Sequence, residues 1–468
     1  MADLFVSDYV APEAAIGLPE LRDLFHRLGA GKLFVKALAP NDNSKNQPYL
    51  STDLSILNAF PTGGPELSDS SSAKDRQKRG EPKLTAALDF SWVLPSGETC
   101  PAPAAKLIYY PQYPEVRFSG FLAGTGRDRY FSVWLNPSKK GRAPGRFIVF
   151  GLCPDGRILG FLAVPYSRLA TDLHDEPGIG TVGALTEIAA DPRYGKSSRR
   201  RLFEELRRIH LKGWIEGKKL GKNGIAMPYR ARNGGGFTLE AELGVLPNAS
   251  PTPDFLDWEV KQFGVTDFDR LSGRAITLMT PQPTGGYYAR HGLEAFIRKF
   301  GYRDRTGKPN RMNFGGVHIA GAKHPLTKLV MRLDGYEPDG NAVNPAGAIR
   351  LVSESDEIAA EWSFEKLIAH WKEKHSHAVY VPSLSRKNGI TNYRYGNEIL
   401  AGEETDFIRV LSALACGEVY FDPGMKLENA FEGKPRVKPR SQFRIKSQSL
   451  GRLYRSFGAV DVLEAVPN

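Results

Sequence analysis

Residues 256–261 (Leu-Asp-Trp-Glu-Val-Lys) alternate apolar and charged side chains with a period of two, which is typical of a β-strand with one buried face. The apolar side chains would point to one side of the strand, and Asp257, Glu259 and Lys261 to the other. If the apolar side is buried in a sheet, Glu259 and Lys261 lie next to each other on the opposite side. The pattern therefore predicts a strand that holds a carboxylate and an ammonium group together in a cleft.

The Glu-x-Lys triplet occurs four times, starting at Glu81, Glu216, Glu259 and Glu432, and only the third lies in an alternating run. The first contains Pro82 in a breaker-rich loop, and the second and fourth contain glycine with no apolar strand around them. Because a quarter of the residues are charged, chance matches are expected. An exposed strand that carries Glu and Lys as a cross-strand ion pair is the alternative interpretation of the third.

Asp254 lies five residues before Glu259 and adds a second carboxylate to this segment. Carboxylate oxygens are ligands for Mg²⁺, and bound Mg²⁺ can activate a water and stabilise negative charge during phosphodiester hydrolysis. Lys261 beside such a metal can orient the attacking water. The segment therefore indicates metal-dependent cleavage of phosphodiester bonds.

Residues 234–262 extend the pattern upstream, because a glycine-rich turn leads to a helical segment with a Leu-Glu pair and a Leu-Gly ending. A variable loop, Asp-Phe and the Glu-x-Lys strand follow. The segment resembles the active-site region of the MvaI/BcnI family of restriction endonucleases, and it is similar to the mismatch-repair nicking enzyme MutH. Both belong to the PD-(D/E)XK nuclease class. The positions that carry the resemblance are Gly235, Gly236, Leu239, Glu240, Leu243, Gly244, Asp254, Phe255, Glu259 and Lys261.

This resemblance implies roles for four residues. Asp254 and Glu259 would ligate Mg²⁺ (for which Mn²⁺ can substitute), Lys261 would act on the water, and Glu240 would be a supporting acid near the metal. The spacing from Asp254 to Glu259 is two residues shorter than in MutH, and Asp257 stands where the relatives have glycine. Asp257 is therefore a rival metal ligand, and Glu242 is a rival of Glu240.

The resemblance continues through residues 274–292 and 364–382 and covers roughly 220–450. In such enzymes His, Arg and Lys side chains on loops contact base edges. The histidines at 370–377 have two other interpretations: a metal cluster, which the lack of Asp or Cys at ligand spacing disfavours, and a helix end complemented by positive charge. The candidates for DNA contacts in this half are Arg290, His291, His370, Lys374, His375 and His377.

The N-terminal part shows short strand patterns at 86–94, 105–110, 115–122, 129–135, 146–152 and 157–164, separated by Pro, Gly and Asn turns. This spacing predicts a barrel-like or sandwich-like β domain. Some relatives of the resembled family carry an added DNA-binding domain with a B3-like β-barrel, and the layout here is similar. A structural or protein-binding β domain is the alternative. Candidates for base reading by loops are Lys36, Asn41, Asn43, Lys45, Gln47, Arg117, Arg127 and Arg129.

A chain of 468 residues is too long for one ordinary core, so several domains are expected. We predict a β-rich DNA-recognition domain over 1–175, a helical connector over 176–220 and an α/β PD-(D/E)XK endonuclease domain over 221–468. Within the last, 257–265 and 274–281 are predicted as strands joined in a hairpin.

The net charge of +11 and the isoelectric point near 9.3 suit a polyanionic partner such as nucleic acid. No run of 18 apolar residues and no basic, apolar leader occur, so neither a membrane span nor a secretory signal is expected. Three widely spaced cysteines predict neither a disulfide framework nor a zinc site. A cytoplasmic location is the resulting expectation.

Together these features predict a Mg²⁺-dependent type II restriction endonuclease that cuts double-stranded DNA, one strand at a time, as a monomer. A cognate DNA methyltransferase in the host would accompany such an enzyme. Two alternatives stay open: a modification-dependent or MutH-like nicking endonuclease, and a DNA-binding protein with a degenerate nuclease fold. The intact Asp254, Glu259 and Lys261 argue against the degenerate fold.

Overall fold

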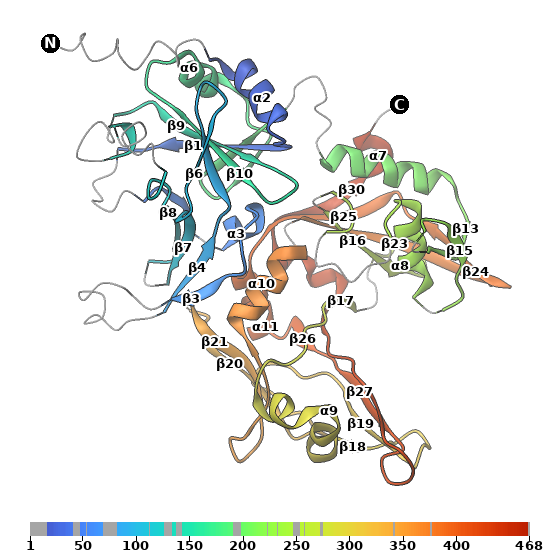
Figure 1. The fold of residues 1–468 in the computed structure, drawn as a ribbon. Helices are drawn as coiled ribbons and strands as arrows, with labels where there is room; N and C mark the ends of the chain where they lie inside the picture. Colours follow the sequence, from blue (N-terminus) through green and yellow to red (C-terminus); the bar gives the residue numbers. More distant parts are fainter. Residues whose placement is uncertain are drawn as a thin grey trace. The chain divides into compact units, whose positions relative to one another are not determined.

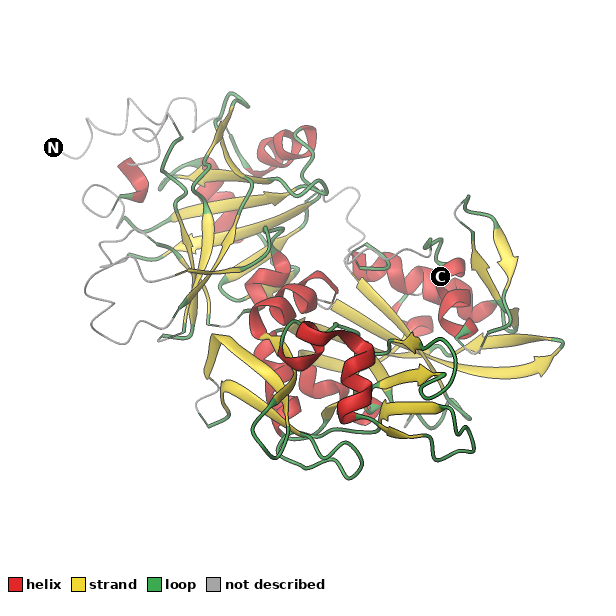
Figure 2. Cartoon of the chain, turned by 60° about the horizontal axis from the view of Figure 1, so that its bottom comes forward, coloured by secondary structure: helices red, strands yellow, loops and turns green. Residues whose placement is uncertain are grey.

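The computed structural model divides the chain into two compact units, Met1–Ser197 and Ser198–Asn468 (Figures 1 and 2). No helix in the part of the chain that it describes is long and apolar enough to cross a membrane. The described residues are 16–40, 47–52, 54–68, 82–111, 113–125, 133–136, 143–190, 198–221, 223–231, 233–246, 253–256, 258–271, 275–339, 342–374 and 377–466.

The first unit contains two sheets. Helices α2 (Leu18–Arg27) and α6 (Arg168–Asp175) bury leucines against the larger sheet. The larger sheet has the order β11 (Gly180–Val182), β12 (Leu185–Ile188), β1 (Lys32–Leu38), β9 (Arg146–Leu152), β10 (Ile158–Ala163), β5 (Phe90–Val93) and β6 (Thr99–Pro101). The smaller sheet has the order β2 (Tyr49–Ser51), β8 (Glu115–Ser119), β7 (Lys106–Tyr110), β4 (Lys83–Ala87) and β3 (Glu66–Ser68), with the short helix α3 (Ser55–Ala59) beside it.

Phenylalanine rings join the two sheets of this unit. The ring of Phe118 on β8 lies 5.1 Å from that of Phe90 on β5 and 5.6 Å from that of Phe150 on β9. The predicted B3-like barrel is not confirmed, because among the described residues the end strands of each sheet form no pairing that would close it. The predicted strand 86–94 is two strands: Leu88 bonds to Ala105 outside the ladder, and the chain passes there from the smaller to the larger sheet.

The second unit begins with a sheet covered by helices α7 (Ser198–Leu211), α8 (Gly234–Glu242) and α12 (Val462–Ala465). Leu202, Leu206 and Leu239 from these helices pack against Trp258 and Val260 of the sheet. The sheet has the order β13 (Ile215–Glu216), β24 (Ile390–Tyr395), β23 (His377–Asn388), β25 (Glu398–Thr405) and β30 (Tyr454–Asp461), and β16 (Trp258–Gly264) pairs in parallel with β23.

Three smaller antiparallel sheets complete the second unit, together with the β14 (Lys218–Leu220) and β15 (Ala226–Pro228) hairpin. The buried Trp362 ring lies 4.8 Å from Phe421 and 5.4 Å from Phe443. The first of these sheets has the order β17 (Ile276–Met279), β29 (Phe443–Ile445) and β26 (Val419–Phe421). The second has the order β18 (Tyr302–Arg303), β19 (Arg311–Gly315), β27 (Gly424–Glu428) and β28 (Arg436–Lys438). The third has the order β20 (Val330–Glu337), β21 (Ala342–Val352) and β22 (Ile358–Ser363). The remaining helices are α9 (Gly286–Phe300), α10 (Phe364–Lys374), α11 (Phe407–Ala415) and the 3-10 helix η1 (Ser447–Leu453).

The hairpin predicted between 257–265 and 274–281 is wrong. Both strands form, but β16 pairs with β23 and β17 pairs with β29, so they belong to different sheets. β16 takes a parallel neighbour that is more than a hundred residues distant in sequence, which no local turn signal predicts. The domain divisions at 175 and 220 stay predictions; β11 and β12 lie in the larger sheet of the first unit, and α7 packs in the second.

Candidate active site

Strand β16 forms where the apolar alternation predicted it, starting at Trp258. The side chains of Trp258 and Val260 are 1% and 6% exposed and pack against the helices. Leu256 does not join that buried face, as the pattern had suggested, because it has a left-handed backbone (φ 55°) and is 48% exposed. The turn at Leu256 lets Phe255 and Trp258 exchange backbone hydrogen bonds just before the strand begins.

Glu259 and Lys261 project from the opposite face of β16, and both are largely removed from solvent. Lys261 Nζ donates to Glu259 Oε1 at 2.8 Å, and Glu259 is only 3% exposed. Burial alone would lower the pKa of Lys261, but the Glu259 carboxylate outweighs it and raises this pKa above its usual value. The pair is therefore a buried ion pair, and the exposed cross-strand alternative is wrong.

Asp254 lies beside the same strand. Its Oδ2 accepts a hydrogen bond from the Val260 backbone N–H at 3.1 Å. Its negative charge also contributes to the raised pKa of Lys261. The structure thus brings Asp254, Glu259 and Lys261 together, while the rival Asp257 lies outside the described residues.

Two buried tyrosines lie beside this group and were not anticipated from the sequence. Tyr380 on β23 is the register partner of Lys261, and its hydroxyl lies 2.7 Å from that of Tyr454 on β30. Burial raises the pKa of Tyr380 to about 12, so its hydroxyl stays protonated at neutral pH. The register of β23 against β16 has no local sequence signal.

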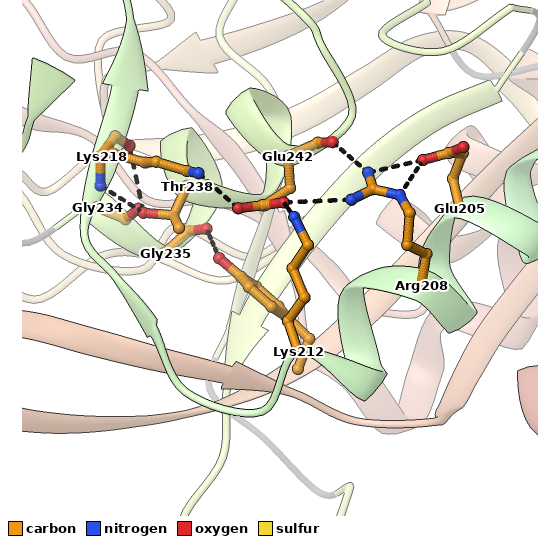
Figure 3. Close-up of polar contacts among 9 residues, drawn as sticks. Glu205, Arg208, Lys212, Lys218, Gly234, Gly235, Thr238 and Glu242 are labelled. Carbon is orange, nitrogen blue, oxygen red and sulfur yellow. Dashed lines mark hydrogen bonds and ion pairs between the residues drawn. The ribbon is translucent and has the colours of Figure 1, made fainter. Parts of the chain in front are cut away.

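The two glutamates of α8 differ in their surroundings. Glu242 is 9% exposed and accepts hydrogen bonds from Lys212 and Lys218, each at 2.6 Å (Figure 3). Burial alone would raise the pKa of Glu242, but the two ammonium groups outweigh it and lower this pKa. Glu242 is thereby tied into structural ion pairs. Glu240 is half-buried, and its negative charge, like that of Glu242, adds to the raised pKa of Tyr395. The proximity of Glu240 to a metal stays a prediction.

The donor set on β16 fits a hard cation. Asp254 and Glu259 offer carboxylate oxygens, which Mg²⁺ prefers. Within the described ranges no cluster of three or more His, Cys, Asp or Glu residues of metal-binding geometry occurs. Mg²⁺ commonly keeps several waters when one or two carboxylates hold it, so Asp254 and Glu259 would leave positions for water and phosphate oxygens.

The other candidates of the second unit are spread over separate elements. His377 begins β23, with its ring 5.2 Å from that of Trp258, and His370 lies on α10. On α9, Arg290 donates to the Gly286 carbonyl at 3.3 Å, and the His291 ring lies 4.1 Å from that of Tyr287. His375 and the side chain of Lys374 lie outside the described residues.

Two of the candidate DNA-contacting residues that the structure describes in the first unit, Gln47 and Arg117, form polar contacts inside that unit. Gln47 donates to the Ser119 hydroxyl and accepts from the Tyr110 hydroxyl, both at 3.0 Å. Arg117 pairs with the neighbouring Glu115 at 2.8 Å, and burial lowers the pKa of Lys36. Asn41, Asn43, Lys45, Arg127 and Arg129 lie outside the described residues.

Comparison with known proteins places the second unit in a family. A family model described as the MvaI/BcnI restriction endonuclease family matches residues 203–454, which is more than half of the chain. A solved MvaI–cognate DNA substrate complex is 17% identical, with a TM-score of 0.43, and the alignment covers 56% of this chain and 97% of that one. MvaI in the absence of DNA is 16% identical, with a TM-score of 0.33, and the alignment covers 57% and 98%. No curated protein matches. On the strength of the family match, the chain belongs to the MvaI/BcnI restriction endonuclease family and is an endonuclease, as the sequence resemblance had predicted.

Proposed function

We propose that the chain is a Mg²⁺-dependent type II restriction endonuclease that hydrolyses phosphodiester bonds of double-stranded DNA at a short sequence. The observation that carries this proposal is the buried Glu259–Lys261 ion pair with Asp254 beside it on β16. Burying charged groups costs free energy of folding, and buried groups with shifted pKa values concentrate at functional sites.

Asp254 and Glu259 would hold Mg²⁺, which supplies positive charge to the scissile phosphate and lowers the pKa of a bound water. The backbone contact from Val260 to Asp254 Oδ2 fixes the carboxylate of Asp254 at the strand. Glu240 is retained as a candidate supporting acid.

Lys261 would act as a proton-bearing, positively charged group. Its raised pKa keeps Nζ an ammonium at neutral pH while Glu259 is its partner. Lys261 Nζ would donate to the attacking water or to a phosphate oxygen and orient it, beside the carboxylates that would hold the metal ion. The packed face of Trp258 and Val260 holds both groups on one rigid strand.

Double-stranded DNA is the proposed substrate, consistent with the net charge of +11 and with the DNA complex of MvaI. With one Asp254–Glu259–Lys261 group per chain, a monomer would cut the two strands of a site in turn. A cognate methyltransferase would protect the host, and the first unit would add sequence recognition. The enzyme would act in the cytoplasm.

The test is cleavage of unmodified and methylated supercoiled plasmid with Mg²⁺, with Mn²⁺ and with EDTA. We expect conversion to nicked and then linear DNA with either metal ion, and none with EDTA. Absence of cutting of any DNA with Mg²⁺ would refute the proposal, and cutting of methylated plasmid alone would favour a modification-dependent enzyme. Sequencing the ends would give the recognition sequence.

A further inference from the structure

Two hairpins of the second unit meet edge to edge: β14–β15 and β23–β24. Strand β13, which leads into the first hairpin, pairs with β24, and the Gly217 N–H donates to the Thr391 carbonyl at 2.9 Å (Figure 1). A Cβ at Gly217 would lie 2.7 Å from the Thr391 oxygen and 2.8 Å from the Tyr229 oxygen. Only glycine fits at this junction, so the hairpin backbones touch. We call residues 217–230 and 384–394 the paired hairpins.

The first hairpin is anchored on α8. The Lys218 N–H donates to the Thr238 hydroxyl at 3.0 Å, and Lys218 Nζ donates to Glu242 (Figure 3). The Tyr229 ring packs edge-on against Phe237 of α8 at 5.1 Å. Because α8 also packs against β16, these contacts fix the paired hairpins relative to the Asp254–Glu259–Lys261 group.

The paired hairpins carry surplus positive charge. Residues 217–239 and 374–397 contain no Asp or Glu, and Glu216 at the junction is the nearest acid in the sequence. Elsewhere in the unit arginines are commonly neutralised, as in the pair of Arg311 with Glu428. Lys218 is paired with Glu242. The other basic side chains of the paired hairpins that the structure describes take part in none of the ion pairs among the described residues: Lys219, Arg230, Arg386, Lys387 and Arg394.

Aromatic rings hold two of these cations in place. The Arg386 guanidinium lies 4.2 Å from the centre of the Trp214 ring, and Lys219 Nζ lies 5.0 Å from that of Tyr229. A guanidinium stacked on a ring keeps the N–H groups of its edge free for two oxygens of a phosphate. The side chains are therefore arranged for an anionic partner before it binds.

We propose that the paired hairpins bind the phosphate backbone of duplex DNA beyond the cleaved bond, without reading its sequence. Along β23, Arg386 lies six residues beyond Tyr380, the register partner of Lys261, which corresponds to about 20 Å or roughly six base pairs. A duplex held at Lys261 is long enough to reach both places. The identity of the partner as DNA rests on the proposed function.

The experiment measures the salt dependence of binding of the full chain to a 30-base-pair duplex of arbitrary sequence, without Mg²⁺. In the test variant, Lys219, Arg230, Arg386 and Lys387 are each changed to Gln. Each phosphate contact contributes about 0.9 to the slope of log affinity against log salt, so losing four contacts should lower the slope by about 3.6 and the affinity by at least about tenfold. A charge-matched control changes four exposed, ion-paired cations to Gln: Arg200, Lys323, Arg332 and Arg452.

An equal change of slope in both variants, or none in the test variant, would overturn the inference. The inference would also fail if the test variant bound DNA normally but no longer self-associated, as measured by sedimentation. The paired hairpins would then be an interface between protein chains. Plasmid cleavage by the wild type is measured in parallel. Cleavage with an unchanged slope refutes only this inference, whereas a changed slope without any cleavage refutes only the proposed function.

Discussion

Glu242 on α8 and Glu259 on β16 are both buried and both accept a hydrogen bond from lysine, at 2.6 and 2.8 Å. Around Glu242 three cations lie within 3.6 Å of its carboxylate, so positive charge is in excess. Around Glu259 the balance is reversed, because Lys261 is joined by the carboxylate of Asp254. A divalent cation would be repelled at the first place and attracted at the second.

The comparison shows that a close Glu–Lys pair does not by itself mark an active site. The charge left over after internal pairing distinguishes a group that stabilises the fold from one that can hold a metal ion. Lys218 illustrates the point, because it belongs to a Glu-x-Lys triplet that context had excluded, and the structure uses it to fix Glu242.

The largest expected effect is on DNA cleavage, which should depend on Glu259 and not on Glu242. Glu259→Ala and Lys261→Ala should each lower the initial rate of Mg²⁺-dependent plasmid nicking by at least about 10³-fold, because a metal ligand or the group that orients the water is lost. DNA binding in a gel-shift assay should survive. Glu242→Gln is the matched control and should cut at temperatures at which it is folded. Normal cleavage by either alanine variant would remove that residue from the site.

A smaller effect decides which aspartate supplies the excess negative charge. Asp254→Asn should lower the nicking rate on the order of 10²-fold, because one metal ligand is weakened, and Asp257→Asn should have much less effect. Raising the Mg²⁺ concentration should restore part of the rate of Asp254→Asn. The reverse ranking of the two variants would make Asp257 the ligand.

The smallest effect is on stability and concerns Glu242. Glu242→Gln should lower the free energy of unfolding by about 1–3 kcal/mol at pH 7, since the lysines that lose their partner are partly exposed. The folded pKa of Glu242 is lowered, so its ionised form stabilises fully above the ordinary value of 4.5 and loses this effect as the pH falls through the folded pKa. Urea unfolding at several pH values should show the difference from wild type shrinking below pH 4.5; a constant difference would contradict the ion-pair explanation.

Much of the local structure could be predicted from short patterns. The strand at 146–152 forms with the predicted bounds, because its apolar run and its flanking turns are local properties. The B3-like barrel is not confirmed, and the hairpin from 257–265 to 274–281 is wrong. Both the closure of a barrel and the pairing of a strand depend on strands that are distant in sequence. For the same reason the buried Tyr380 and Tyr454 beside Lys261 could not be foreseen.

The sequence by itself determined the strand at Trp258–Gly264, its buried face and the family, because six alternating residues and a thirty-residue motif carry that information. Only the tertiary structure decided the charge around each glutamate. Lys212 reaches Glu242 from 30 residues away, and Arg208 reaches it from helix α7, which ends just before Lys212. A glutamate in a sequence shows its own charge, but its function depends on which charges the fold places around it.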